Sequence, residues 1–297
     1  MRHKRWRWLV ALLALTALVG AACGDDEGDG GGGGTVEEFP ADTTMGRIQE
    51  AGEIVIGVKF DVPPFGFKNP QTDEVEGFDV EMGGFIADAL GVEPTYVEAI
   101  SDNRIPFLQD GTVDLILSTM TITTDRDAEI DFSEPYFIAH GRILVPEDSD
   151  IAGVEDLAGR TVCTALGSTY EENLGESAPE AELQLVDSYS ECLELVQTGA
   201  VDAVSTDDVI LTGMIIQDPT LMLVGDELTV EPYGIGIKDG ETEFKEFVDG
   251  VLADVKEDGR WQELFDKWIG QYTGQEATPP DLTLDEALEL RPCVETC

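Results

Sequence analysis

Hydrophobic residues recur along this chain with two alternating periods. Residues 54–58 form a short, unbroken apolar run of strand length. The apolar positions of residues 82–90 recur at helical spacing and end before Gly91, a residue that favours a helix stop. The same alternation returns later, where a helical pattern over residues 209–215 leads into the apolar run 221–224. Strands separated by such helices predict an α/β fold with layered sheets.

Two amphipathic helices are expected further along, at residues 244–255 and 261–269. One face of the second carries large apolar side chains, at Trp261, Leu264, Phe265 and Trp268. Such a stripe predicts core packing rather than stacking against a ligand. Residues 275–297 contain two consecutive prolines and are expected to form a loosely attached extension.

One pattern occurs twice, in residues 108–119 and in residues 196–206. Each stretch reads as a helix end, a glycine, and a β-branched strand that finishes in Ser-Thr. Because α/β sheets bind ligands beyond the carboxyl ends of their strands, the two polar strand ends favour two similar lobes that share a ligand. The alternative is that this junction is simply common in α/β proteins.

Composition narrows the function classes. The 297 residues, 42% of them hydrophobic, suffice for the cores of two domains. Seventeen Lys and Arg against 62 Asp and Glu give a formal charge of −45, which excludes a nucleic-acid partner. The two histidines, His3 and His140, leave little from which to build a His-rich metal centre or a Ser-His-Asp triad.

The N-terminus reads as an export signal. Residues 8–19 are apolar but too short to span a bilayer, and small residues follow them up to Cys23. Four cations precede this stretch, at Arg2, Lys4, Arg5 and Arg7. We therefore expect residues 1–22 to be a lipoprotein signal peptide and Cys23 to be lipidated, although Gly20 departs from the usual lipobox; an ordinary signal peptide is the alternative. Residues 23–43, acidic and rich in glycine, predict a flexible tether.

Short motifs that carry a family resemblance follow one another in order through both halves of the chain. They occupy residues 59–65 (KFDVPPF), 76–81 (EGFDVE), 103–106 (NRIP), 120–126, 131–136 (DFSEPY), 163–169, 189–192 and 205–207. From residue 44 to 272 the chain resembles the family 3 extracellular solute-binding proteins of amino-acid ABC transporters, and among them the glutamate-binding lipoproteins.

The resemblance implies the type II periplasmic-binding-protein fold, in which two hinge strands join two α/β lobes. The chain would cross between the lobes near residues 139–143 and 228–233. Lobe 1 would then hold residues 44–138 plus 234–274, and lobe 2 residues 142–228. In this fold a ligand closes the cleft by a hinge motion.

An α-amino acid needs a cationic partner for its carboxylate and an anionic partner for its ammonium group. By resemblance, Arg126 grips the α-carboxylate, helped by Thr121 and the neighbouring Thr119. Asp207, at the end of a lobe 2 strand, matches the acceptor of the ammonium group. Alternatives remain for each. Arg126 could instead pair with a surface carboxylate at Asp125, Asp127 or Glu129; Asp207 could cap the next helix, and Asp208 is its rival in either role.

Arg104 resembles the arginine that binds the distal carboxylate in glutamate and aspartate receptors, and Lys59 lies where the cleft would open. Ser168 and Thr169 precede a helix N-terminus, where free N–H groups favour an anion. As alternatives, Lys59 could pair with Asp61, and Arg104 could serve the structure or a glutamine amide. Two phenylalanines, Phe65 and Phe78, are expected in the core or the cleft wall.

Export permits disulfides. Cys163 and Cys192 match a cysteine pair of the glutamate-binding relatives, and such a bond would close a loop of about 30 residues and stabilise the fold by about 3–4 kcal/mol. Cys293 and Cys297 could close a small ring, cross-link chains or remain free.

The function implied is capture of glutamate or aspartate by a lipid-anchored receptor outside the cytoplasmic membrane, for delivery to the permease subunits of an ABC importer. No cofactor and no catalytic group are expected. A receptor for another polar amino acid such as glutamine is the alternative ligand choice. A periplasmic cyclohexadienyl dehydratase on the same fold, and a sensor partner, are the alternative functions.

Overall fold

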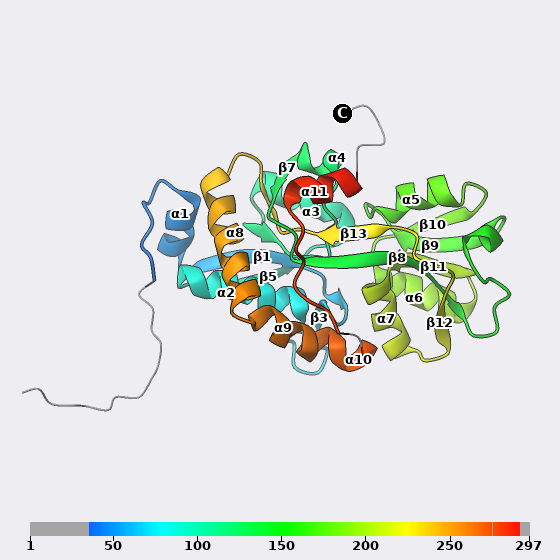
Figure 1. Ribbon diagram of the computed structural model, residues 1–297. Coiled ribbons are helices and arrows are strands. Elements are labelled where there is room, and N and C mark those ends of the chain that lie inside the picture. The colour runs from blue at the N-terminus through cyan, green and yellow to red at the C-terminus, as the bar shows by residue number, and fades with distance from the viewer. Residues whose placement is uncertain (1–35, 275, 292–297) are drawn as a thin grey trace, which may run out of the picture. The chain divides into compact units, whose positions relative to one another are not determined.

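In the computed structural model, which describes residues 36–274 and 276–291, two separate sheets each form the centre of a lobe (Figure 1). The predicted signal peptide, Cys23, Cys293 and Cys297 lie outside the described residues.

The first sheet has the strand order β5-β1-β6-β14-β7. Its parallel strands are separated by helices, as the alternating pattern predicts. Between residues 44 and 132 the elements are α1 (Thr44–Ala51), β1 (Glu53–Val58), β2 (Asp61–Val62), β3 (Gly66–Lys68), β4 (Val75–Glu76), α2 (Phe78–Leu90), β5 (Glu93–Glu98), the 3-10 turn η1 (Ser101–Asn103), α3 (Arg104–Asp110), β6 (Leu115–Ile116), α4 (Thr124–Asp127) and β7 (Ile130–Phe132). The short strands β2, β3 and β4 form a small sheet of their own.

The second sheet has the order β10-β9-β11-β8-β12. Its elements are β8 (Phe137–Pro146), the 3-10 turn η2 (Val154–Leu157), β9 (Thr161–Ala165), α5 (Tyr170–Ser177), β10 (Glu182–Val186), α6 (Tyr189–Thr198), β11 (Ala203–Asp207), α7 (Asp208–Gln217) and β12 (Leu221–Val224). Strand β13 (Val230–Tyr233) pairs antiparallel with the first part of β8. The chain then returns to the first sheet through β14 (Gly236–Lys238).

We call the part of the molecule built on the first sheet lobe 1 and the part built on the second sheet lobe 2. Strand β8 extends from lobe 1 into lobe 2, with β13 beside it (Figure 1). The predicted crossings fall on these two strands. The exact lobe boundaries given above stay a prediction.

The C-terminal helices cover lobe 1. They are α8 (Thr242–Glu257), α9 (Arg260–Phe265), the π-helical turn η3 (Asp266–Gly270), α10 (Gln271–Thr273) and α11 (Leu284–Leu290). The core prediction for this region is confirmed for Trp261, Leu264 and Phe265, all at most 2% exposed. Phe65 and Phe78 are fully buried and contact one another in the same aromatic core.

Helix boundaries follow the local sequence. The predicted stop after α2 is confirmed, because Gly91 ends the helix at a φ of 70°. The repeated motif is also confirmed: α3 and α6 both end at a glycine, and each is followed by a buried strand, β6 or β11.

Two expectations about the chain ends are wrong. The C-terminal extension is not loose, because Ala287 of α11 is fully buried and Leu284 and Leu288 pack against the same hydrophobic cluster. Residues 36–43 do not all belong to a flexible tether, because the Phe39 ring packs edge-to-face on Phe247 at 5.4 Å. In both segments a few apolar side chains pack against lobe 1, although the overall polar composition of the segments favours a flexible chain.

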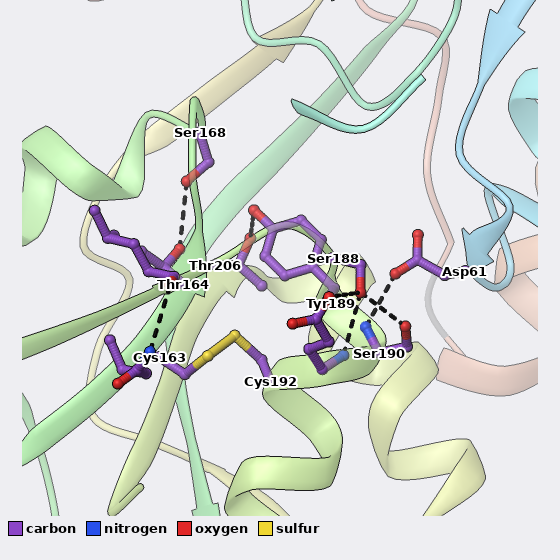
Figure 2. The surroundings of a disulfide bond; sticks show 12 residues. Asp61, Cys163, Thr164, Ser168, Ser188, Tyr189, Ser190, Cys192 and Thr206 are labelled. Carbon is purple, nitrogen blue, oxygen red and sulfur yellow. Dashed lines mark hydrogen bonds between the residues drawn. A yellow bond between two sulfur atoms is a disulfide. The ribbon is translucent and has the colours of Figure 1, made fainter. Parts of the chain in front are cut away.

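A disulfide joins Cys163 of β9 to Cys192 of α6 (Figure 2), as the resemblance implies. Both cysteines are fully buried.

Within residues 36–274 and 276–291, none of the helices combines the length and the apolar character that crossing a membrane requires.

Candidate functional site

A small cavity lies between the two lobes, at the carboxyl ends of strands from both sheets. Lobe 1 and lobe 2 each contribute half of its lining: Ser101, Arg104, Thr119, Thr121 and Arg126 on one side, and Ser168, Thr169, Tyr170, Tyr189 and Asp207 on the other. The structure therefore brings together seven of the eight predicted ligand residues. The volume is about 10 Å³, about that of one water molecule, so an amino acid could enter only if side chains or lobes moved apart.

Arg126 reaches the cavity from the four-residue helix α4. Thr123 caps this helix by accepting the Arg126 main-chain N–H. The guanidinium donates to the Thr121 main-chain oxygen at 2.7 Å and, across the cavity, to the Gly167 oxygen at 3.0 Å. Desolvation lowers the pKa of Arg126 to about 9, which still leaves the group charged at neutral pH. Its donors thus point into the cavity rather than toward a surface carboxylate.

Thr119 has an unusual backbone, with a φ of 46°. A β-branched residue rarely adopts a positive φ, so the surroundings must hold it there. The buried Asp79 does so by accepting the Thr119 N–H at 2.9 Å, while the Tyr136 hydroxyl donates to its other oxygen at 2.8 Å. Burial raises the pKa of Asp79 to about 7. Sequence reasoning missed this supporting role of Asp79, although it lies in a motif that carried the resemblance.

Arg104 is almost fully buried, at 2% exposure. Its guanidinium donates to main-chain oxygens of Ser101, Ser118 and Thr119, each at 3.1 Å, and of Gly167 at 3.3 Å. A guanidinium has five N–H groups, so these four bonds leave one for any other acceptor. Arg104 therefore supports the cavity wall in this structure.

Lys59 lies one step behind the cavity lining. Its Nζ donates to the Ser101 hydroxyl at 2.8 Å and sits 5.5 Å from the centre of the Tyr189 ring. Desolvation, with the Arg104 charge adding to it, lowers the pKa of Lys59 to about 7. The alternative pairing with Asp61 does not describe its hydrogen bonding, because Asp61 accepts the Ser190 N–H at 2.9 Å instead.

The loop before α5 supplies the lobe 2 side of the cavity. Gly167 has a φ of 73°, and its carbonyl oxygen accepts from both arginines. Ser168 bonds the Thr164 hydroxyl at 3.3 Å (Figure 2), and Thr169 donates to the buried carboxylate of Glu231 at 3.0 Å. In the predicted anion site, the hydroxyl groups of Ser168 and Thr169 therefore already have hydrogen-bond partners within the protein.

Asp207 ends strand β11 and faces the cavity at 4% exposure. Its two carboxylate oxygens accept from the hydroxyls of Tyr170 at 2.9 Å and Tyr233 at 2.7 Å. Burial raises the pKa of Asp207. Asp207 occupies the N-cap position of α7, but its side chain makes no capping bond, so that alternative is wrong. The Asp208 side chain instead accepts the main-chain N–H of His140 at 3.1 Å.

Three lining residues were not predicted: Ser101, Tyr170 and Tyr189. Tyr170 directly follows Thr169, so its position after the polar loop was an available signal. Tyr189 begins one of the motifs that carried the resemblance, and its hydroxyl accepts from Thr206 at 2.7 Å (Figure 2).

The arrangement can bind a zwitterion. Two guanidinium groups and one carboxylate meet in a small, largely dehydrated space, where each charge interacts strongly with a ligand of opposite sign. Among residues 36–274 and 276–291, three or more metal-ligating side chains nowhere gather into a possible ion site.

Comparison with known proteins identifies the family. Residues 54–271 match the bacterial extracellular solute-binding proteins of family 3. The chain is 40% identical, over 88% of its length and 95% of the relative's, to the ABC transporter glutamine-binding protein GlnH of Bacillus subtilis (strain 168). It is 33% identical, over 96% of its length and 100% of the relative's, to the glutamate-binding protein GluB of Corynebacterium efficiens.

A solved structure is similar in both sequence and fold. An ancestral arginine-binding protein bound to glutamine superposes with a TM-score of 0.71 at 36% identity, covering 74% of this chain and 98% of that one. The fold prediction, a type II periplasmic binding protein, is confirmed.

Proposed function

We propose that this chain, which belongs to the bacterial extracellular solute-binding proteins of family 3, binds an acidic amino acid, glutamate or aspartate, between its lobes. Its role as the solute-binding protein of an amino-acid ABC transporter follows from the family and the relatives. The identity of the ligand, the residues that hold it and delivery to permease subunits are the proposal.

One observation carries it: the Arg126 guanidinium of lobe 1 and the Asp207 carboxyl group of lobe 2 line the same cavity. Burial raises the pKa of Asp207, and a ligand ammonium group beside it would favour its charged form. An α-amino acid offers a carboxylate to the first and an ammonium group to the second. Only a protein with both lobes close together makes both contacts, so binding favours that arrangement. The ligand carboxylate would take the place of the Gly167 oxygen as acceptor for Arg126.

The charge balance around the cavity favours an acidic side chain. Arg104 and Arg126 contribute two positive charges to the lining and Asp207 one negative charge. Behind the lining, Lys59 adds a positive charge whenever it is protonated. Two buried carboxyl groups also lie there: Asp79 is near Lys59 and Arg104, and Glu231 pairs with Arg291, so a net positive excess remains. A zwitterion with a neutral side chain leaves this excess unmatched, whereas a second carboxylate offsets it.

Glutamine is the second candidate, for a specific reason. Four of the five N–H groups of Arg104 already have main-chain acceptors, so only one is available to a distal carboxylate. A single donor suits an amide oxygen as well as it suits a carboxylate. The relative GlnH, described as glutamine-binding, makes this choice the relevant competitor.

Isothermal titration of the purified protein with the twenty amino acids tests the proposal. We expect heat with glutamate or aspartate and weaker binding of glutamine. If only glutamine binds, glutamine is the ligand and the acidic amino acids are not. If none of the twenty amino acids gives heat of binding, the proposal of an amino-acid ligand is wrong.

Substitution of the cation assigned to the distal carboxylate tests specificity. Arg104→Gln should raise the Kd for glutamate about tenfold more than the Kd for glutamine, because it removes one charge-assisted hydrogen bond. Equal losses for both ligands would show that Arg104 only supports the wall. Arg160→Gln is the matched control, because Arg160 is partly exposed and pairs with Asp150 and Asp202 away from the cavity lining.

We also propose that Cys23 carries the lipid that anchors the protein outside the cytoplasmic membrane. Metabolic labelling with a fatty acid should mark the wild type and leave Cys23→Ala unlabelled. Label on both proteins would contradict the anchor at this position.

A further inference from the structure

The C-terminal segment that follows residue 275 is fixed to lobe 1. Lys256 donates to the Pro280 oxygen at 3.3 Å, and Glu134 accepts the Leu284 N–H at 2.7 Å at the start of α11. Thr283 and Glu286 form a capping box at the same end of the helix. In Figure 1, α11 lies above the first sheet, close to α4. The segment therefore brings its last described residue, Arg291, to a defined place.

Arg291 contacts three elements at once. Its main-chain oxygen accepts both the N–H and the hydroxyl of Thr124, at 3.1 and 3.0 Å, in the helix α4 that carries Arg126. Its guanidinium lies 3.3 Å from the Glu231 carboxylate on β13 and donates to the Asn173 side-chain oxygen at 2.8 Å on α5 of lobe 2. The side chain is only 13% exposed.

Glu231 connects this contact to the cavity. Its carboxylate is fully buried and accepts from Thr229 at 2.6 Å, from Asn173 at 3.2 Å and, on its other oxygen, from Thr169 at 3.0 Å. A buried carboxylate is costly unless a cation compensates it, and Arg291 is the cation that pairs with it. Thr169 lines the cavity, so the chain of contacts runs from Arg291 through Glu231 to the cavity wall.

We infer that Arg291 is a positioning residue for ligand binding, which fixes Thr169 on the cavity wall through Glu231 and holds lobe 2 against lobe 1 through Asn173. This inference rests on the proposed function, since it assigns a role in capture of an amino acid. It also gives the C-terminal segment a task beyond covering apolar surface.

Arg291→Gln tests the inference because it removes the charge and keeps a hydrogen-bonding side chain. The Kd for the best ligand of the wild type should rise about tenfold, within the range of ordinary coupling between sites, and mainly through faster dissociation. Arg291→Lys should recover part of the affinity, since it restores the charge without the fork that reaches Asn173. Arg47→Gln, which removes an exposed cation paired with Glu241, should leave the Kd unchanged.

A double-mutant cycle separates positioning from general loosening of the tail. Thr169→Val removes the hydroxyl that Glu231 holds, so Arg291→Gln should add less than threefold to the Kd in that background. Fully additive effects would overturn the inference. So would a Kd for Arg291→Gln equal to that of Leu288→Ala, which weakens the packing of α11 but keeps the guanidinium.

Amide hydrogen exchange without added amino acid keeps this test independent of the proposed function. Arg291→Gln should accelerate exchange at residues 169–174 of lobe 2 as well as in α11. Acceleration confined to residues 276–291 would contradict the inference even if the protein binds glutamate well. Conversely, the wild type could bind none of the twenty amino acids while Arg291→Gln accelerates exchange in both regions. That outcome would defeat the proposed function and leave the link between the lobes intact.

Discussion

Arg126 and Gly167 are joined across the cavity, by a hydrogen bond of 3.0 Å from the guanidinium to the main-chain oxygen. The Arg126 side chain of lobe 1 thereby holds the loop before α5 in lobe 2 through the main chain of Gly167. The absence of a Cβ is essential here, since one placed on Gly167 would lie 2.7 Å from the Asp102 Cα.

Gly167→Ala should therefore weaken ligand binding more than it weakens the fold. The added methyl group collides with lobe 1 only when the lobes are close, and such a clash costs about 1–3 kcal/mol, which corresponds to a rise in Kd of about 5- to 150-fold. Titration calorimetry measures this. Gly159→Ala is the matched control, because its φ of 71° imposes the same backbone strain with no atom near the new methyl group. Equal Kd changes in the two variants would show that strain alone, and not contact between lobes, is responsible.

Arg126→Ala should reduce the affinity for every amino acid that the wild type binds. The α-carboxylate is common to all of them, and loss of one partner of a desolvated charge pair costs about 2 kcal/mol or more, or about 30-fold in Kd. Arg160→Ala removes a partly exposed arginine of lobe 2 that does not line the cavity, and it should leave the Kd unchanged. Retained affinity for any amino acid in Arg126→Ala would refute the role given to the guanidinium.

The disulfide should contribute to stability. Cys163 and Cys192 are 29 residues apart, so reduction or Cys163→Ala with Cys192→Ala should lower the free energy of unfolding by about 3–4 kcal/mol in the chain-entropy description. Urea titration with and without a reducing agent measures the difference in the wild type. A change below about 1 kcal/mol would mean that β9 and α6 hold one another without the bond.

His140 should make stability depend on pH. It lies on β8 between two carboxylates, with Asp208 at 3.9 Å and Glu227 at 3.8 Å, and the Asp208 carboxylate beside its ring raises its pKa. Since the pKa is higher in the folded state, the stabilisation is fully present below the ordinary pKa of 6.5 and is lost as pH rises through the raised value. The unfolding free energy of the wild type minus that of His140→Gln should therefore be larger at pH 5.5 than at pH 8.5. The opposite sign, or no difference, would contradict the pairing.

Much of the fold could be read from periodicity. The helix α2 and its stop at Gly91, and the two helix-glycine-strand junctions, have strong local signals that tertiary contacts reinforce. The polar groups after strands of both lobes could be predicted to face one ligand, because each α/β sheet binds ligands beyond the carboxyl ends of its strands. The resemblance then assigned Arg126 and Asp207 their expected partners.

The supporting contacts could not be read in this way, because they join residues distant in sequence. Tyr233 and Tyr170 hold Asp207 from separate elements, and Asp79 holds Thr119 from 40 residues away. The C-terminal helix does have a local signal, because Leu284, Ala287 and Leu288 have the i, i+3, i+4 spacing of a packed helix. The prolines just before it favour a loose segment, and the two signals conflict within a few residues.

The inward placement of Lys59, Arg104 and Arg126 has a kinetic consequence. A chain with a formal charge of −45 places three of its 17 cations beside one cavity and buries three carboxylates, at Asp79, Asp207 and Glu231, so its exterior stays as strongly acidic as the composition suggests. A glutamate anion must cross that repulsive field before it meets any attraction. Added electrolyte screens the field, so the association rate for glutamate should increase with ionic strength while that for uncharged glutamine stays constant.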